Sequence, residues 1–296
     1  MRYKTFTHIP VLLKESADAL ITNKNGIYLD ATLGLGGHSK YFLTKLGKEA
    51  KLIGIDRDSQ AVKFAEDILK GHTNVTLKQA NFADVLKVLE ELEINSLDGV
   101  FFDLGLSSYQ LEDAERGFSF SKDGRLDMRF DSTSKLTAEE IVNTYGYDKL
   151  VYILRNYGEE RFAEKIAEKI IRERKMTPIQ TTTHLVTLIE TVLKRSGKIH
   201  PATRTFQALR IAVNDELGNV AKGLERVSKV ISVGGRIAVI SFHSLEDRIV
   251  KLFFKKLSED GKWKLINKKP LIPATEEISA NPRARSAKLR VIERKK

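Results

Sequence analysis

Apolar positions in the first 110 or so residues follow two different spacings, and their alternation predicts strands separated by helices. Short continuous apolar runs predict buried strands at 27–31, 52–55, 75–78 and 99–103. Apolar residues three and four positions apart predict helices over 14–21, 38–46, 59–70 and 83–93. This alternation is typical of an α/β fold with a doubly wound, mainly parallel sheet.

The alternation stops after residue 112, and helical spacing takes over. Helices are predicted at 137–143, 148–156, 159–174, 182–193 and 203–216. Within 159–174 the apolar face is formed by Phe162, Ile166 and Ile170, with two alanines beside them. The region 113–215 is therefore predicted to be a helical insertion.

Strand character returns near the C-terminus. A fifth strand is predicted at 234–243, its helix at 245–257, and a final hairpin-like pair at 263–266 and 287–292. We therefore predict a discontinuous sheet domain, 1–112 and 216–296, interrupted by the helical domain 113–215.

A glycine-rich turn follows the first strand and is the first candidate site. It contains Gly34, Gly36 and Gly37, and it lies between Asp30 and a helix that opens near His38. A dinucleotide-binding fingerprint would need a third glycine where this chain has Ser39. An acid followed by such a turn suits S-adenosylmethionine, although a purely structural turn explains these residues nearly as well.

Further candidates stand at the ends of the next strands. Asp56 follows the second strand about 20 residues after the turn, where an acid can hold ribose hydroxyls. Either Asp58 or Ser59 can cap the following helix, which leaves Asp56 available for a ligand. Phe82 follows the third strand as an adenine contact or a core aromatic, and Asp103 ends the fourth. Because parallel strands open ligand crevices at their carboxyl ends, the repeated placement predicts one pocket.

Composition narrows the chemistry. Apolar content of 42% and charged content of 30% are those of a globular protein. The absence of cysteine excludes disulfides, thiolate zinc sites and a cysteine nucleophile. The six histidines show no metal-binding spacing with carboxylates, so no metal site is expected. With no long apolar run and no signal-like N-terminus, the expected location is cytoplasmic, with no membrane partner.

The net charge of +11 is concentrated at the C-terminus. Residues 262–296 contain 11 Lys and Arg against 3 Asp and Glu, a charge of +8. Such a patch favours a polyanion, although solubility or a heat-adapted proteome would also account for it. Arg283, Arg285 and Lys288 are candidates for contacts with the anionic groups of such a partner.

Longer motifs resemble one known family from end to end. The chain resembles the bacterial ribosomal RNA small-subunit methyltransferase H family, also called MraW. The resemblance is carried by the glycine turn and by the segments HIPVLL (8–13), DLGLSS (103–108), ERGFSF (115–120), LDMR (126–129), YGEERF (157–162), HPATRTFQ (200–207), ISFHSLEDR (240–248) and NPRAR (281–285). Members transfer a methyl group from S-adenosylmethionine to the N4 amine of a cytosine in 16S rRNA. The resemblance thus implies a Rossmann-like class I methyltransferase sheet and a substrate in the small ribosomal subunit.

The resemblance also implies the site residues. Carried over position by position, the cofactor contacts fall on Gly36, Gly37, His38, Asp56, Phe82, Asp103 and Gln110. Gln110 rests on the resemblance alone. One departure is Tyr109, where the family usually has proline, and this leaves the course of the loop open.

The expected reaction needs a proton acceptor near the attacking nitrogen. Asp103 and His243 are the candidates, with helix capping or core packing as the competing role of His243. His200, beside a proline at a helix start, is a candidate substrate contact or a structural residue. A methyltransferase acting on adenine N6 and an RNA-binding assembly factor with a vestigial pocket are the rival functions. Neither the oligomeric state nor the particular cytosine follows from the sequence.

Overall fold

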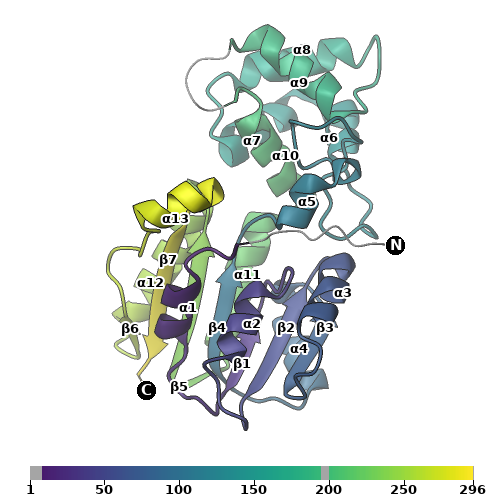
Figure 1. Ribbon diagram of the computed structural model, residues 1–296. Coiled ribbons are helices and arrows are strands. Elements are labelled where there is room, and N and C mark those ends of the chain that lie inside the picture. Colours follow the sequence, from purple (N-terminus) through teal and green to yellow (C-terminus); the bar gives the residue numbers. More distant parts are fainter. Residues whose placement is uncertain (1–8, 195–199, 296) are drawn as a thin grey trace. The chain divides into compact units, whose positions relative to one another are not determined.

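The chain divides into two compact units in a computed structural model, which describes residues 9–194 and 200–295. The first unit comprises Met1–Gly105 and Leu217–Lys296, and the second comprises Leu106–Glu216 (Figure 1). Of the sequence motifs, only the first residue of HIPVLL, His8, lies outside the described residues. The predicted boundaries, 113–215 for the insertion, differ from the second unit mainly at the N-terminal side.

The first unit is built on a seven-stranded sheet within the described residues, in the order β3-β2-β1-β4-β5-β7-β6. Its strands are β1 (Ile27–Asp30), β2 (Lys51–Asp56), β3 (Val75–Gln79), β4 (Leu97–Asp103), β5 (Ile231–Ser241), β6 (Trp263–Leu265) and β7 (Lys288–Arg294). Strands β1 to β5 are parallel, and β7 runs antiparallel between β5 and β6. The Rossmann-like sheet and the final antiparallel pair are therefore confirmed.

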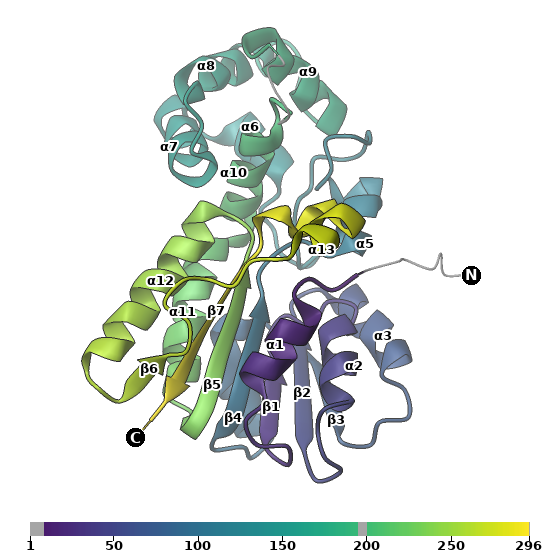
Figure 2. The same ribbon diagram turned by 60° about the vertical axis from the view of Figure 1, so that its left-hand side comes forward.

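Helices cover both faces of this sheet (Figures 1 and 2). One face packs against α1 (Leu13–Leu20), α2 (Gly37–Leu43) and α3 (Ser59–Ile68). The other packs against α4 (Val85–Glu91), α11 (Glu216–Ser228) and α12 (Ser244–Glu259). Because both faces are buried, the central strands are nearly continuously apolar, as their sequences indicate.

The second unit is helical and has its own core. It contains α5 (Ser108–Glu112), α6 (Ala138–Thr144), α7 (Tyr147–Gly158), α8 (Ala163–Glu173), α9 (Thr182–Val192) and α10 (Thr203–Asn214). Apolar side chains from α6 to α10 form one cluster, which includes Ile166, Ile170 and Phe206. The helical character predicted for the insertion agrees with these elements.

Several element predictions were wrong in detail. The predicted helix at 203–216 ends at Asn214, because Asp215 adopts a left-handed conformation with φ of 48°. The predicted helix at 159–174 begins only at Ala163, and Phe162 is 46% exposed rather than part of the apolar face. The helices α11 and α13 (Thr275–Ala280) were not predicted. None of the helices in the described residues has the length and apolarity to cross a bilayer.

Candidate functional site

The backbone conformation of the glycine turn between β1 and α2 favours glycine at two positions. Gly34 and Gly36 have φ values of 51° and 79°, in the left-handed region that favours glycine. At Gly36 a Cβ would also lie 3.3 Å from the Ala65 Cβ, because α3 packs closely behind the turn. Gly36 is buried, and Gly34 and Gly37 are half-buried, so the turn presents backbone at these two glycines beside the carboxyl ends of β1 and β2.

The carboxylate of Asp30, the last residue of β1, accepts hydrogen bonds from the turn and from α2. Its side chain is fully buried, and the Ser39 hydroxyl donates a 2.7 Å hydrogen bond to it. The Thr32 N–H donates to its other oxygen at 3.2 Å. Burial raises the pKa of Asp30 to about 6. The serine at the position of the expected third glycine is thus a structural partner of the strand-end acid.

Asp56, the last residue of β2, supports the same turn. The Gly34 N–H and the Asp58 N–H each donate a 2.8 Å hydrogen bond to its carboxylate. Burial raises the pKa of Asp56 to about 6. Asp58 caps α3 by accepting a hydrogen bond from the Gln60 N–H at 3.0 Å, as expected for one of the two predicted caps. The Arg57 backbone also interacts with this carboxylate. Because a carboxylate has about four lone-pair sites, Asp56 keeps acceptor capacity for ligand hydroxyls.

Asp103 ends β4 and lies beside β1 and α2. Its N–H donates to the Thr32 hydroxyl at 2.6 Å, and its Oδ2 lies 3.5 Å from Nδ1 of His38. The other oxygen, Oδ1, is buried without a hydrogen-bond partner among the described residues. A buried acceptor left unpaired is costly, so this atom marks a position where a ligand donor would be stabilised.

The protonation of Asp103 and His38 follows from their surroundings. Burial, together with the nearby Glu246 carboxylate as the smaller cause, raises the pKa of Asp103 to about 7. Burial also lowers the pKa of His38, whose Nε2 lies 3.0 Å from the Val11 carbonyl. Because a carbonyl can only accept, Nε2 bears the proton and Nδ1 is a lone pair facing Asp103. Asp103 is therefore poised to exchange a proton near neutral pH.

Phe82 and Gln110 occupy different environments. Phe82 begins a short 3₁₀ turn after β3, and its ring meets Phe102 edge-on at a centroid distance of 5.5 Å. Gln110 belongs to the helical unit, where its side chain accepts from the Ser107 N–H at 3.1 Å in a capping box of α5. Both have structural roles, and their contacts with the cofactor stay predictions.

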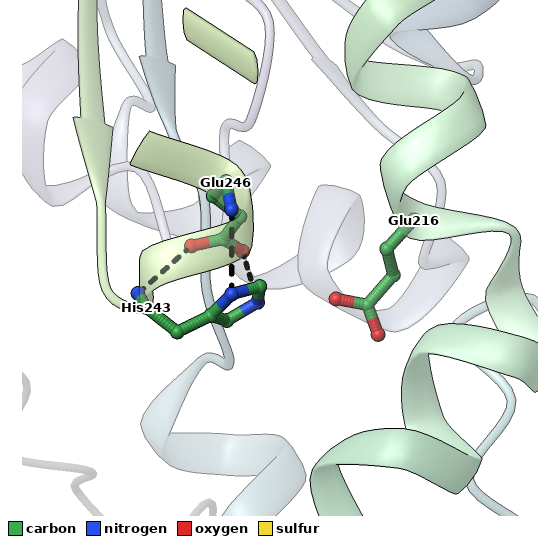
Figure 3. A group of neighbouring side chains, drawn as sticks. All are labelled: Glu216, His243 and Glu246. Carbon is green, nitrogen blue, oxygen red and sulfur yellow. Dashed lines mark hydrogen bonds and ion pairs between the residues drawn. The ribbon is translucent and has the colours of Figure 1, made fainter. Parts of the chain in front are cut away.

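His243 caps α12, one of the two roles considered for it from the sequence. Its Nδ1 accepts from the Glu246 N–H at 3.4 Å, and the Glu246 carboxylate accepts in return from the His243 N–H at 3.3 Å (Figure 3). The His243 Nε2 lies 3.1 Å from Glu246 Oε1. Glu216, also drawn in Figure 3, belongs to the helical unit, where it pairs with Arg210 at 2.8 Å. Proton transfer by His243 stays a prediction.

His200 also has a structural environment. Its ring stacks on Phe120 at a centroid distance of 4.7 Å, and its Nδ1 accepts from the Ala202 N–H at 3.2 Å. Its Nε2 lies 3.4 Å from the Glu190 carboxylate. These contacts position the start of α10, and a substrate contact stays a prediction.

The sequence analysis did not identify the residues that position these strand-end acids or shift their pKa values. The Ser39 hydroxyl donates to the Asp30 carboxylate, and the Thr32 hydroxyl accepts from the backbone N–H of Asp103. Glu246 raises the pKa of Asp103 from the neighbouring strand connection. The spacing between His243 and Glu246 is that of a capping box and signals the helix start. No sequence signal indicates that the carboxylate of this cap lies near Asp103.

Donors and acceptors at these strand ends suit S-adenosylmethionine. Asp56 offers acceptors for ribose hydroxyls, and Asp103 Oδ1 offers an unpaired buried acceptor for an amine. A Cβ on Gly34 would meet the Thr32 carbonyl oxygen at 3.9 Å, an ordinary van der Waals distance, so no other part of the chain crowds this side of the turn. The carboxylates also match the positive charge of a sulfonium. The residues present therefore fit this group.

Comparisons with known proteins agree with the resemblance seen in the sequence. The MraW methylase family matches residues 5–295. The ribosomal RNA small subunit methyltransferase H of Elusimicrobium minutum is 53% identical over 98% of this chain and 99% of its own length. The protein of the same name from Caldicellulosiruptor bescii is 50% identical over 98% and 99%. An rRNA methylase structure from Streptococcus thermophilus covers 100% of both chains at 12% identity, with a TM-score of 0.46.

Proposed function

The chain belongs to the MraW methylase family, and we propose that it methylates the RNA of the small ribosomal subunit. It is a methyltransferase, and its methyl donor is S-adenosylmethionine. The acceptor we propose is the N4 amine of a cytosine in 16S rRNA. We further propose that the substrate is presented by an assembled or nearly assembled small subunit, in the cytoplasm.

The structural observation that supports this chemistry best is the unpaired oxygen of Asp103. When bound, S-adenosylmethionine supplies an electrophilic methyl group. A cytosine amine is a weak nucleophile, because its lone pair is delocalised into the ring, and it must lose a proton after it attacks. A carboxylate with a pKa of about 7 can accept that proton near neutral pH. Asp103 is thus the proposed proton acceptor.

Most of the cofactor contacts that we propose lie at or just after the strand ends of the first unit. Gly36, Gly37 and His38 provide the turn and the helix start, Asp56 holds the ribose, and Phe82 contacts the adenine. Gln110 is included because the family motif predicts it. Asp103 has a second role here, since its free oxygen can accept a hydrogen bond from the cofactor.

We propose that the inserted helical unit recognises RNA. It exposes aromatic side chains, with Tyr152 55% exposed and Phe162 46% exposed. The Lys165 ammonium lies 5.9 Å from the ring centroid of the exposed Phe162. The Lys149 ammonium lies 3.6 Å from the ring centroid of Tyr145, which is half-buried against the helical core. Exposed rings beside cations are the groups on which unpaired bases stack.

The rival functions have less support. Enzymes that methylate adenine N6 usually carry an Asn/Asp-Pro-Pro-aromatic tetrapeptide after the fourth strand, and this chain has Asp103-Leu-Gly-Leu106 instead. Methylation of pyrimidine C5 normally needs a cysteine that adds to C6, and the chain has none. An assembly factor with a vestigial pocket would not bind S-adenosylmethionine, which a calorimetric titration can measure.

The experiment that tests this function is product analysis. The purified protein is incubated with S-adenosylmethionine and with small subunits from cells that lack this gene, and the RNA is digested to nucleosides for mass spectrometry. We expect N4-methylcytidine, and no trapped protein–RNA adduct when 5-fluorocytosine is placed at the target. A product methylated at C5 or at the ribose 2′-oxygen would overturn the assignment. Protein-free 16S rRNA, tested in parallel, measures the dependence on subunit assembly.

A further inference from the structure

A second pocket lies in the first unit at the carboxyl end of β5, where Phe242 and His243 are part of its lining. Its walls come from the end of β5, the start of β7 and the segment around α13, which runs beside the upper ends of these strands in Figure 2. Phe242, Pro273 and Ile278 provide apolar surface. The cavity volume is about 250 Å³. Since small-molecule pockets usually hold roughly 300–1,000 Å³, this one suits a single small unit.

Two cations line the same pocket. Lys288 is held by Asp247, with 3.2 Å between its Nζ and Oδ2, and Asp247 also binds Arg290 at 2.7 Å. Two cations share this one carboxylate, so the cluster retains a positive charge. Arg285 is exposed, and within residues 9–194 and 200–295 no hydrogen bond or ion pair occupies its guanidinium. The pocket therefore combines a fixed cation with an available one.

The strand register relates this pocket to the site of methyl transfer. Asp103 on β4 pairs with Ile240 on β5, and Ile240 pairs with Leu289 on β7, one residue after Lys288. Neighbouring strands are about 4.8 Å apart, so β7 lies roughly 10 Å from β4. Phe242 also packs on Gly105, where a Cβ would lie 3.0 Å from its ring. The pocket therefore adjoins the end of β4 and is distinct from the glycine turn.

We propose that this pocket binds one nucleotide of the substrate RNA that neighbours the methylated cytosine. Its phosphate binds Arg285 and Lys288, and its sugar and base pack against Phe242, Pro273 and Ile278. The mixture of two cations and an apolar wall matches a nucleotide better than a free anion, which would not use the apolar side. The proposal rests on the proposed function, because it requires an RNA substrate. Its consequence is that specificity depends on a nucleotide other than the target.

The kinetic test uses Arg285→Gln in the full chain with small subunits as substrate. Loss of a charge-assisted phosphate contact should raise KM for the subunit about 10-fold or more, with kcat and the affinity for S-adenosylmethionine unchanged. Lys268→Gln is the matched control, because it removes the same charge from the same C-terminal segment. Lys268 is exposed and does not line the pocket. Arg285→Lys should recover much of the loss. Equal KM changes for Arg285→Gln and Lys268→Gln would overturn the pocket and indicate a diffuse electrostatic effect.

A direct test follows the isoleucine methyl resonances of the full chain by NMR during titration with cytidine 5′-monophosphate. The Ile272 and Ile278 signals should shift with the nucleotide, much less with cytidine or inorganic phosphate, and not at all in Arg285→Gln. Equal shifts with inorganic phosphate would overturn the nucleotide proposal and indicate a site for simple anions. If the wild-type protein methylates subunit RNA while these signals stay fixed, the pocket proposal alone fails. If it methylates no RNA, the proposed function fails first.

Discussion

Two aspartates near the carboxyl ends of the sheet have opposite electrostatic environments. Asp103, after β4, has a contact with a neutral histidine and one unpaired oxygen, and burial raises its pKa to about 7. Asp247, in the first turn of α12, is also mostly buried; burial pushes its pKa upward, but hydrogen bonds from Arg290 and Lys288 outweigh this and lower it. A buried carboxylate with cationic partners is part of the structure. A buried carboxylate without such partners has stability to gain from a ligand, and this supports Asp103 as the proposed proton acceptor.

The largest effect expected from this contrast is on stability. Asp247→Ala leaves Arg290, which is only 9% exposed, buried without its carboxylate. Breaking such a pair costs roughly 3–5 kcal/mol in the free energy of unfolding. Urea denaturation measures the change, with Asp18→Ala as the control. Asp18 forms an exposed pair with Lys14 at 3.8 Å, and its loss should cost less than about 1 kcal/mol. Similar losses of unfolding free energy in both variants would show that the buried pair stabilises the protein no more than the exposed one.

The next effect is on catalysis. Asp103→Asn keeps the shape of the side chain but cannot accept the proton, so single-turnover methyl transfer at saturating S-adenosylmethionine should slow by about 100-fold or more. Stability should not fall. Because the folded pKa of Asp103 is raised, its stabilising contribution is present below pH about 4 and is lost as the pH rises through about 7. The asparagine variant should therefore unfold no more easily than wild type at pH 8. If Asp103→Asn transferred methyl groups at the wild-type rate but unfolded more easily, Asp103 would have a structural role and would not be the proton acceptor.

A smaller effect is expected at Asp56. Asp56→Ala should lower the affinity for S-adenosylmethionine about 10-fold or more, through loss of hydrogen bonds to the ribose. It also removes the acceptor of the Gly34 N–H, at 2.8 Å, so part of the loss is a looser turn. Asp58→Ala is the matched control, because it removes a helix cap worth roughly 0.5–2 kcal/mol and should leave the affinity unchanged. Calorimetric titration of both variants separates the two roles, and unchanged affinity in Asp56→Ala would exclude the ribose contact.

The strand-end acids could be predicted from sequence because their strands are short apolar runs. A buried parallel strand needs apolar residues on both faces, so the first polar residue after Leu29, Ile55 or Phe102 marks its carboxyl end. Topology then brings these ends together without further information. The positions of three carboxylates were therefore predictable, although their protonation was not.

The features that could not be predicted from the sequence depend on contacts between distant segments. Helix α11 was missed because Gly218 and Gly223 weaken its helix propensity. The structure gives the reason for Gly223, since a Cβ there would lie 2.7 Å from the Phe82 ring. Likewise, Glu246 raises the pKa of Asp103 across 143 positions of sequence, and no local pattern encodes that proximity. The pocket beside α13 was hidden for the same reason, because its walls come from separate segments.

The smallest effect expected from the contrast is a proton released when the cofactor binds. A cationic ligand beside Asp103 favours the ionised carboxylate, so binding should release about half a proton at pH 7, where a group with a pKa of about 7 is half protonated. Affinity should therefore rise with pH up to about 8 and then level off. Calorimetry in two buffers of different ionisation enthalpy counts the protons.

The groups that face Asp103 determine the control for this measurement. His38 on α2 and Glu246 at the start of α12 lie near it, and Asp30 on β1 interacts with it electrostatically. Asp30 and Asp56 have pKa values of about 6, so their contribution at pH 7 is smaller than that of Asp103 and grows toward pH 6. In Asp103→Asn, proton release at pH 7 should fall to this remainder, whereas Asp247→Asn should not alter it, because cationic partners already hold Asp247 ionised. If release at pH 7 persisted in Asp103→Asn, the titrating group would be one of the other two acids, and the contrast between the paired and the unpaired aspartate would not extend to cofactor binding.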